Sequence, residues 1–289
     1  MSEISVENVS FFHGKGTPYE IKALDGVTLN IVPNTITGII GHTGSGKSTL
    51  VELFNGILKP AEGRVLLDGA DIWAKPKEIR NVRFRVGLVM QYPESQLFEE
   101  TIRQDIAFGP RNMGLSEQEI EERVIEAAGF VGLGKDMLDK SPFDLSGGQK
   151  RRAAIAGIIA MRPDVLILDE PAAGLDPAGR EAIFSNIMEY RKNSGSTVVI
   201  VSHSMEDMAR YCDRVMVMSE GKLIMNGTRD EVFSKPERLA EAGLDIPQIT
   251  KLMLLLRERG IEVDTGVYTS ERAYEELIRL FKKDTAQSR

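Results

Sequence analysis

The sequence contains a single cysteine, Cys212, so the chain has no second thiol with which to form an internal disulfide. This scarcity is typical of proteins from a reducing compartment. The chain also lacks an excess of positive charge, because 36 lysines and arginines against 43 aspartates and glutamates give a net charge of −7. Since nucleic-acid-binding proteins usually carry a basic surface, we expect no nucleic-acid partner.

Long hydrophobic runs are missing as well. The run 153–161 is interrupted by Gly157 and falls well short of the roughly 20 apolar residues that a membrane-spanning helix needs. The first ten residues have neither the basic nor the apolar segment of a secretory signal. We therefore expect a chain that does not cross a bilayer by itself, with 289 residues available for one large domain or two modest ones.

Strand-like and helix-like segments alternate along most of the chain. Short β-branched runs bounded by Gly, Pro or Asp predict strands at 4–9, 36–40, 65–67, 86–90, 165–168, 197–201, 215–218 and 223–225. Capped or amphipathic segments predict helices at 47–57, 117–128, 148–161 and 177–192. This alternation predicts an α/β fold with a mostly parallel core sheet, and the early strands predict an antiparallel β-subdomain.

Two regions depart from the alternation. Residues 101–145 contain no strand pattern and predict a helical insertion, so a helical subdomain is expected over about 101–160. After residue 235 two amphipathic helices are expected, so we predict a core domain over 1–235 and a helical extension over 236–289. Their apolar stripes are Ile249, Leu252, Met253 and Leu256, then Tyr274, Leu277, Ile278 and Phe281. Packing within the chain is favoured for these stripes over a partner surface.

The segment GHTGSGKST (41–49) matches the pattern G-x-x-x-x-G-K-[ST] and lies between an expected strand and an expected helix. Such a loop directs backbone N–H groups toward phosphates, helped by the positive end of the helix. The predicted ATP-binding residues are Gly41, His42, Thr43, Gly44, Ser45, Gly46, Lys47, Ser48 and Thr49. Lys47 would reach the β- and γ-phosphates, Ser48 would bind Mg²⁺, and Thr49 would bind a phosphate oxygen. The alternative is a glycine-rich turn that arose by chance.

The segment VLILDE (165–170) ends a buried strand with two acids. Asp169 is predicted to hold Mg²⁺, mostly through water, and Glu170 to act as general base toward the attacking water. Ligands of such folds bind at the carboxyl edge of the sheet, where this pair emerges. The alternative is a solvated acidic pair with no catalytic role.

A second phosphate-binding pattern, LSGGQKRR, begins at Leu145, about a hundred residues after the first. Ser146 and the N–H groups of Gly147 and Gly148 form an anion site at a helix start, and Gln149 follows them. This order of motifs resembles the ATP-binding cassette (ABC) ATPases over residues 4–230. Gln91 matches that family's Q-loop, Asp176 its D-loop and His203 its switch histidine.

The resemblance implies a reason for two phosphate-binding patterns in one chain. In ABC ATPases two subunits pack head to tail, and each ATP lies between one subunit's Lys47-type loop and its neighbour's Ser146-type helix. Gln91 would then contact Mg²⁺ and the water, while His203 would orient the site and sense the γ-phosphate. His13 occupies the position where the family often stacks an aromatic ring on adenine.

Three stretches are similar to the ATPases of energy-coupling factor (ECF) transporters, and closer to the second of their two paralogous ATPases: 41–49, 91–112 and 145–180. The similarity implies ATP and Mg²⁺ as cofactors, a paralogous second ATPase, a transmembrane coupling protein and a membrane substrate-capture protein for vitamins, cobalt or nickel. The chain would be peripheral on the cytoplasmic face of the membrane, with its C-terminal helices stabilising the ATPase dimer. Tyr92, Pro93 and Glu94 would help to form the groove for the coupling protein, with Glu94 either pairing with a cation there or remaining solvated.

Two other functions are compatible with an ATP-binding loop. One is an ATP-gated clamp or regulatory switch without transport. The other is a small-molecule kinase, which the sequence disfavours because LSGGQ would then have no task. Chromosome-maintenance ATPases are disfavoured as well, since only a helical insertion fits between the two phosphate-binding patterns.

Overall fold

The computed structural model describes the backbone of residues 2–287 and the side chains of residues 2–280. Its strands are β1 Ile4–His13, β2 Ile21–Ile31, β3 Ile36–Ile40, β4 Glu62–Leu67, β5 Ala70–Asp71, β6 Val86–Val89, β7 Val165–Asp169, β8 Thr197–Val201, β9 Arg214–Ser219 and β10 Lys222–Thr228. Its α-helices are α1 Lys47–Phe54, α2 Ile79–Arg85, α3 Ile102–Asn112, α4 Glu117–Phe130, α5 Lys135–Leu138, α6 Gly147–Ile159, α7 Pro177–Ser194, α8 Met205–Tyr211, α9 Arg229–Phe233, α10 Pro236–Glu241, α11 Gln248–Glu258 and α12 Ser270–Gln287. Short 3₁₀ helices are η1 Pro76–Glu78, η2 Pro93–Gln96 and η3 Pro142–Asp144.

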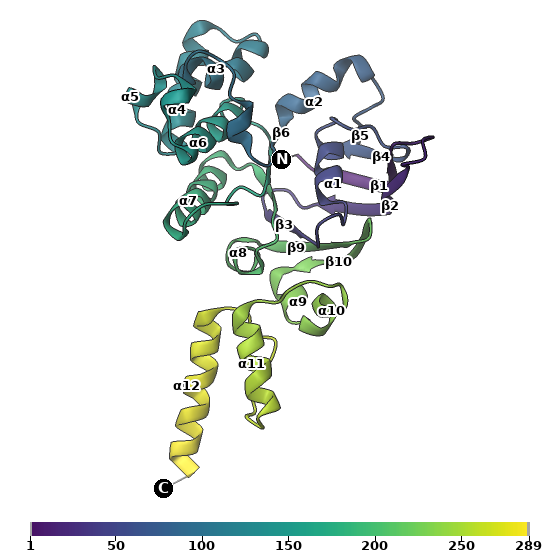
Figure 1. Cartoon of the computed structure of the whole chain (residues 1–289), viewed down its shortest axis with the longest axis vertical. Coiled ribbons are helices and arrows are strands. Elements are labelled where there is room, and N and C mark those ends of the chain that lie inside the picture. The colour runs from purple at the N-terminus through teal and green to yellow at the C-terminus, as the bar shows by residue number, and fades with distance from the viewer. Residues whose placement is uncertain (1, 288–289) are drawn as a thin grey trace.

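Six strands form the central sheet in the order β10-β9-β3-β8-β7-β6 (Figure 1). The strands β9, β3, β8, β7 and β6 are parallel to one another, and β10 pairs antiparallel with β9 at the edge. A second sheet, β2-β1-β4-β5, is antiparallel. The predicted α/β fold with a mostly parallel core sheet and an antiparallel β-subdomain is therefore confirmed.

Alternate residues of the central strands point to opposite faces of the sheet. In β7, Leu166 and Leu168 face a core that they share with α3, α4, α6 and α7. Val165 and Ile167 face the other core, which they share with α1 and the antiparallel sheet. Because both faces are covered, these strands are continuous apolar runs rather than alternating ones. As a result, α1 and α6 pack on opposite faces of the sheet (Figure 1).

Helix ends differ from the predictions by one to three residues. α1 ends at Phe54 rather than at residue 57, because Gly56 turns the backbone to φ 69° and the Asn55 side chain donates to the Val86 carbonyl. α6 begins one residue earlier than predicted and ends at Ile159 rather than at 161, just before Arg162 adopts φ 52°. A left-handed residue cannot continue a right-handed helix, so both ends have a local backbone cause.

The predicted helical insertion is present. The described segment 101–145 holds α3, α4 and α5 without a strand, and α4 begins with the predicted capping box of Ser116 and Glu119. Together with α6 these helices form a lobe on one side of the central sheet (Figure 1).

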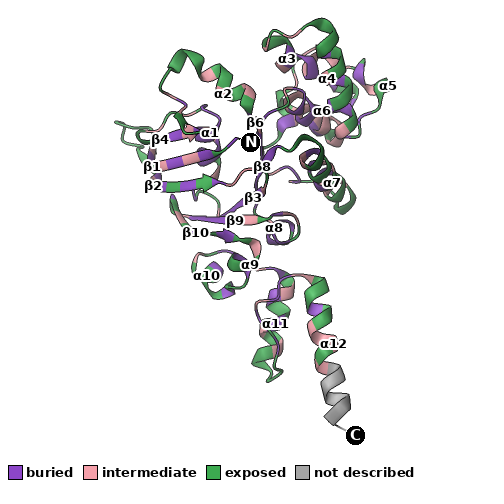
Figure 2. Cartoon of the chain, turned by 180° about the vertical axis from the view of Figure 1, so that it is seen from behind, coloured by how far each residue is buried: buried purple, intermediate pink, exposed green. Residues whose placement is uncertain are grey.

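The two C-terminal helices were predicted correctly, but their packed faces were predicted only in part. They extend away from the core and pack on each other through a cluster of their own, which includes Met253 and Ala273 (Figure 2). Leu252 and Tyr274 were expected in the packed stripes and are 42% and 68% exposed instead. The side chain of Phe281 lies outside the described residues. Within residues 2–287 no helix, these two included, is both long and apolar enough to span a bilayer.

We predict that two glycine substitutions change the stability of the fold in opposite directions. Gly87 is buried in β6, and a Cβ there would lie 2.6 Å from Ile158 and 3.0 Å from Pro163, so Gly87→Ala should destabilise the fold by about 1–3 kcal/mol. A Cβ at Gly129 in α4 would have nothing within 4 Å, so Gly129→Ala should stabilise it by up to about 1 kcal/mol. Urea unfolding of both variants checks this, and equal midpoints would contradict it.

Candidate functional site

The phosphate-binding loop joins β3 to α1 at the carboxyl edge of the central sheet. Two of its glycines are required by close approach, because a Cβ at Gly41 would lie 2.4 Å from the Met218 carbonyl and one at Gly46 would lie 2.6 Å from the Ala23 carbonyl. Gly46 also has φ 99°, a conformation that favours glycine. No side chain among the described residues caps α1, so its first N–H groups are available for an anion.

Lys47, the first residue of α1, folds back over this loop. Its ammonium donates to the carbonyls of Gly41 at 2.7 Å and His42 at 2.9 Å. Burial lowers the pKa of Lys47, while the nearby carboxylates of Glu170 and Asp169 act in the opposite direction. The loop therefore holds a partly desolvated positive charge at the position where the sequence predicted contact with phosphates.

The structure brings together Ser48 and Asp169, two of the three residues predicted to hold Mg²⁺. The Ser48 hydroxyl donates to a carboxylate oxygen of Asp169 at 2.9 Å, which links the start of α1 to the end of β7. Burial raises the pKa of Asp169, the nearby Glu170 adds to the rise, and the hydrogen bond from Ser48 opposes it. Both side chains offer hard oxygen donors, the kind that Mg²⁺ prefers. Within residues 2–280 no group of three or more His, Cys, Asp or Glu side chains is arranged to hold a metal ion.

Glu170 and His203 lie together at the ends of the neighbouring strands β7 and β8. Nδ1 of His203 lies 2.8 Å from a carboxylate oxygen of Glu170, and the Ser202 hydroxyl lies 3.4 Å from the other. Glu170 has φ 52°, which costs a non-glycine residue about 1–2 kcal/mol. Its N–H donates to the Val201 carbonyl at 2.9 Å, so the strained turn is tied to β8. Strain of this kind is often found at functional sites, and here it directs the carboxylate toward the histidine.

Gln91 and His13 lie at the margin of this group. Gln91 follows β6, the neighbour of β7, and its exposed side chain has no hydrogen-bond partner among the described residues. Nε2 of His13 lies 3.2 Å from the Thr49 hydroxyl, and the ring packs edge-on against Phe11. His13 is thus next to the phosphate-binding loop, while its contact with adenine stays a prediction.

The signature segment forms the start of α6. Ser146 and Gln149 make a capping box, in which the Ser146 hydroxyl accepts from the Gln149 N–H and the Gln149 side chain accepts from the Ser146 N–H at 2.8 Å. Leu145 is buried and anchors the segment. A Cβ at Gly147 or Gly148 would have nothing within 4 Å, so packing inside the chain does not require glycine at either position.

The two phosphate-binding helix starts are separate within one chain. α1 and α6 cover opposite faces of the sheet, and among the described residues no hydrogen bond joins 145–149 to 41–49. Asp176 is separate from both, and its carboxylate caps α7 by accepting from the Gly179 N–H at 2.8 Å.

Sequence reasoning missed the buried Arg151 of α6. Its guanidinium makes two hydrogen bonds, at 3.0 and 3.1 Å, to the carboxylate of Glu94. Glu94 was expected either to pair with a cation at the groove or to remain solvated, and it does pair with a cation, which is Arg151 of the same chain. The segment QKRR resembles a solvated basic helix face, so nothing in the local sequence indicated a buried ion pair.

Comparison with known proteins gives the site a family context. A family model described as "ABC transporter" matches residues 24–173. The chain is 53% identical over 279 residues to the energy-coupling factor transporter ATP-binding protein EcfA2 of Caldanaerobacter subterraneus subsp. tengcongensis, covering 96% of this chain and 98% of the relative. It is 50% identical over 280 residues to the protein of the same name from Clostridium acetobutylicum, with 96% and 98% covered.

Solved structures share the fold. One is cbiO1 from Clostridium perfringens, described as part of the ABC transporter complex cbiONQ, with a TM-score of 0.73 and 43% identity over 86% of this chain and 98% of that one. Another is the ATP-binding cassette MJ0796, a dimer in a post-hydrolysis state bound to ADP and Pi. Its TM-score is 0.71 and its identity 27%, over 78% of this chain and 98% of that one.

Asp169→Asn should raise the melting temperature of the nucleotide-free chain at neutral pH. The raised pKa of Asp169 means that its charged form destabilises the folded state. Asn carries no charge, and its amide oxygen can still accept the hydrogen bond from the Ser48 hydroxyl. The expected gain is about 2–4 °C, which corresponds to roughly 1 kcal/mol in a chain of comparable size. It should shrink as the pH falls through the folded pKa, because the wild-type carboxyl is then protonated.

Scanning calorimetry over a pH series measures this difference. Asp139→Asn is the matched control, since hydrogen bonds from Arg103 lower the pKa of the exposed Asp139 and Asn should bring no gain there. If Asp169→Asn instead lowers the melting temperature at neutral pH, the attraction between the wild-type Asp169 carboxylate and Lys47 outweighs the cost of burying that carboxylate.

Proposed function

Because this chain belongs to the ABC transporter family, and within it to the ATP-binding subunits of energy-coupling factor transporters, we propose how it couples ATP hydrolysis to transport. Mg²⁺-ATP is hydrolysed at an interface with a second ATPase subunit, and the resulting movement passes to a transmembrane coupling protein. The observation that carries the proposal is the meeting of three functional segments at one edge of the sheet. The loop after β3, the acids at the end of β7 and the histidine after β8 are joined there by hydrogen bonds.

Lys47 and the N–H groups of the loop bind the phosphates of ATP. Phosphoryl transfer needs positioning and charge stabilisation more than covalent chemistry, and a lysine held over a ring of backbone donors supplies both. Ser48 and Asp169 hold Mg²⁺, with Gln91 as a further oxygen donor. When bound, this ion neutralises the negative charge on the phosphate oxygens.

Glu170 takes a proton from the attacking water. Its carboxylate is partly buried and restrained by His203 and Ser202, so one oxygen can be directed at a water beside the γ-phosphate. His203 is exposed and hydrogen-bonded to this base, which suits it to orient the base and to respond to the γ-phosphate. Protonated Glu170 then returns the proton to solvent as the phosphate leaves.

The second ATPase subunit supplies the signature helix for this chain's ATP, and this chain supplies its own signature helix to the partner's ATP. Two observations support this arrangement. Ser146 and Gly147 are exposed on the face of the sheet opposite α1, and the glycines beside Ser146 leave open space in which a partner's phosphate fits. The similar cassette MJ0796 is a dimer. By the resemblance of this chain to one of two paralogous ATPases, the partner is the paralogue.

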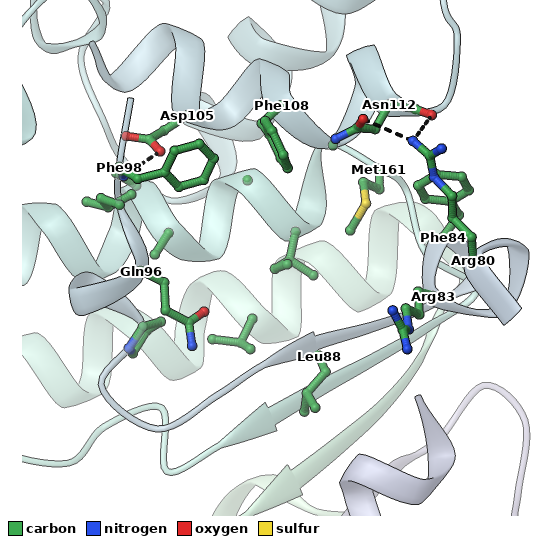
Figure 3. Close-up of a pocket in the computed structure, with 18 residues that line it drawn as sticks. Arg80, Arg83, Phe84, Leu88, Gln96, Phe98, Asp105, Phe108, Asn112 and Met161 are labelled. Atoms are coloured by element: carbon green, nitrogen blue, oxygen red, sulfur yellow. Dashed lines mark hydrogen bonds between the residues drawn. The ribbon is translucent and has the colours of Figure 1, made fainter. Parts of the chain in front are cut away.

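A cavity of about 340 Å³ is the docking site for the coupling protein. It lies between α2, η2, α3 and α6 and is lined by apolar side chains that include Phe84, Leu88, Phe98, Phe108 and Met161 (Figure 3). Phe98 is 64% exposed and packs edge-on against Phe108. Aromatic side chains exposed around a cavity are typical of a protein-binding groove.

The location of this groove links docking to catalysis. Pro93 lines it, and Tyr92 lies between Pro93 and the catalytic candidate Gln91. A helix of a membrane protein in this groove would hold the chain at the cytoplasmic face of the membrane as a peripheral subunit. The cargo, a vitamin, cobalt or nickel, is chosen by a separate membrane substrate-capture protein.

Glu170→Gln should abolish turnover without abolishing ATP binding. The amide keeps the shape of the side chain but cannot accept the proton, so kcat should fall by about 10²–10⁴-fold. ATP-bound dimers of the ATPase subunits should accumulate, because opening follows hydrolysis. Phosphate release and size-exclusion chromatography measure the two effects, and wild-type turnover in the variant would exclude Glu170 as the base.

Ser146→Arg tests the sharing of each site between two subunits. The new side chain would occupy the space for the partner's phosphate, so turnover at the partner's site should fall by about 10²-fold or more. The isolated chain should still bind a fluorescent ATP analogue with wild-type affinity, since its own loop leads into α1, which packs on the opposite face of the sheet from α6. Ser116→Arg, which alters the similar capping box of α4, should leave turnover unchanged. Loss of ATP binding by the isolated Ser146→Arg chain would contradict a shared site.

A further inference from the structure

Arg151 is a buried charge whose task is not explained by the hydrolytic site itself. It lies five residues after Ser146 in α6, and its side chain is only 5% exposed. Arginine is rarely buried to this extent unless its charge is paired and its hydrogen bonds are satisfied. Its contacts therefore show which parts of the chain it holds together.

The first contact joins α6 to η2, the short helix that follows Gln91. Nε and Nη2 of Arg151 donate to the two carboxylate oxygens of Glu94 at 3.1 and 3.0 Å, a fork that fixes orientation as well as distance. Burial by itself would raise the pKa of Glu94, but the hydrogen bonds and charge of Arg151 hold that pKa below its usual value. The pair is therefore ionised at neutral pH.

The second contact joins α6 to the turn after the catalytic acid. Nη1 of Arg151 donates to the carbonyl of Ala173. The N–H of Ala173 in turn donates to the carbonyl of Glu170 at 3.2 Å, so Ala173 closes the turn that begins at Glu170. One guanidinium thus binds both the segment after Gln91 and the segment after Glu170.

The groove lies directly beside this junction. Pro93 and Gln96 of η2 form one part of its wall, and Ala153 and Ala154 of α6, two and three residues after Arg151, form another (Figure 3). η2 is itself held by a left-handed Tyr92, whose carbonyl accepts from the Ser95 hydroxyl at 2.8 Å. A protein seated in the groove would therefore press on two elements that Arg151 ties together.

We infer that Arg151 is a positioning residue that holds η2, the signature end of α6 and the turn after Glu170 in one arrangement. It touches neither the nucleotide-binding loop nor Ser146, and acts through the segments that it joins. The inference rests on the proposed function, because the arrangement matters only if Ser146 and Glu170 act on ATP. Its expected effect is on turnover rather than on ATP binding.

Two substitutions break the junction in different ways. Arg151→Lys keeps the charge, but a single ammonium cannot reproduce the planar fork to Glu94 and also reach Ala173. Arg151→Met removes the charge at similar length. In the assembled transporter both should lower kcat by about 10- to 100-fold, the usual cost of a misplaced catalytic group. The KM for ATP should stay within about twofold of wild type, because Lys47 and its loop are not in contact with Arg151.

Arg103→Met is the matched control. Arg103 also bridges two carboxylates of the helical lobe, those of Glu121 and Asp139, but it is bonded to none of the three joined segments. Its loss should leave kcat unchanged. A fall in kcat of equal size for Arg103→Met would assign the effect to general weakening of the lobe and overturn the inference.

A double-mutant cycle tests the partnership with Glu94. Glu94→Gln should lower kcat in the same direction, and Arg151→Met combined with Glu94→Gln should cost no more than Arg151→Met alone. Additive losses would mean that the two side chains act independently. Unchanged kcat in both Arg151→Lys and Arg151→Met would also overturn the inference.

Hydrogen exchange of the isolated chain gives a readout that does not depend on turnover. Arg151→Lys should speed amide exchange at 93–96, 146–151 and 171–175 together, whereas Arg103→Met should not. Faster exchange in only one of these segments would contradict a common junction. If Glu170→Gln kept wild-type turnover, the proposed function would fail while this measurement still reported on Arg151. If Glu170→Gln is inactive but Arg151→Lys has wild-type kcat and wild-type hydrogen exchange, the inference about Arg151 fails while the proposed function stands.

Discussion

The hydrogen bond between Ser48 and Asp169 joins the two halves of the chain on which the site depends. Ser48 begins α1 after β3, and Asp169 ends β7 more than a hundred residues later. They meet because parallel strands all end at the same edge, and β8 between them adds His203 to the same edge. A parallel sheet thus concentrates a lysine, a hydroxyl, two carboxylates and an imidazole, although among residues 2–287 no two of its parallel strands are joined by a tight turn.

The same sheet also keeps the second phosphate-binding helix apart. Alternate side chains of each strand serve two cores, so α1 and α6 are packed on opposite faces and neither can shift toward the other without breaking a core. In the proposed dimer the signature helix therefore serves the nucleotide of the other subunit, and the way the sheet is covered accounts for this dependence on a partner.

For a membrane partner to control hydrolysis, the groove in which it docks must be connected to the carboxyl edge of the central sheet. The groove and the turn after Glu170 are linked in this chain by the buried Arg151, which pairs with the part-buried Glu94 and donates to the Ala173 carbonyl. Breaking a buried ion pair leaves an uncompensated charge, which is costly, so the connection is stiff.

The sequence by itself located the phosphate-binding loop, the acidic pair, the signature segment and most strands along the chain, because each is a local pattern of neighbouring residues. It also indicated the lack of a membrane-spanning run. It did not reveal the partner of Glu94 or the exposed Leu252 and Tyr274, because these depend on side chains contributed from distant segments. Only the tertiary structure decided that His203 contacts Glu170, that the two helix starts lie on opposite faces of the sheet, and that Arg151 joins α6 to η2 and to the turn after Glu170. Such contacts are set by how strands are ordered and covered in space, and the linear spacing of residues does not record that.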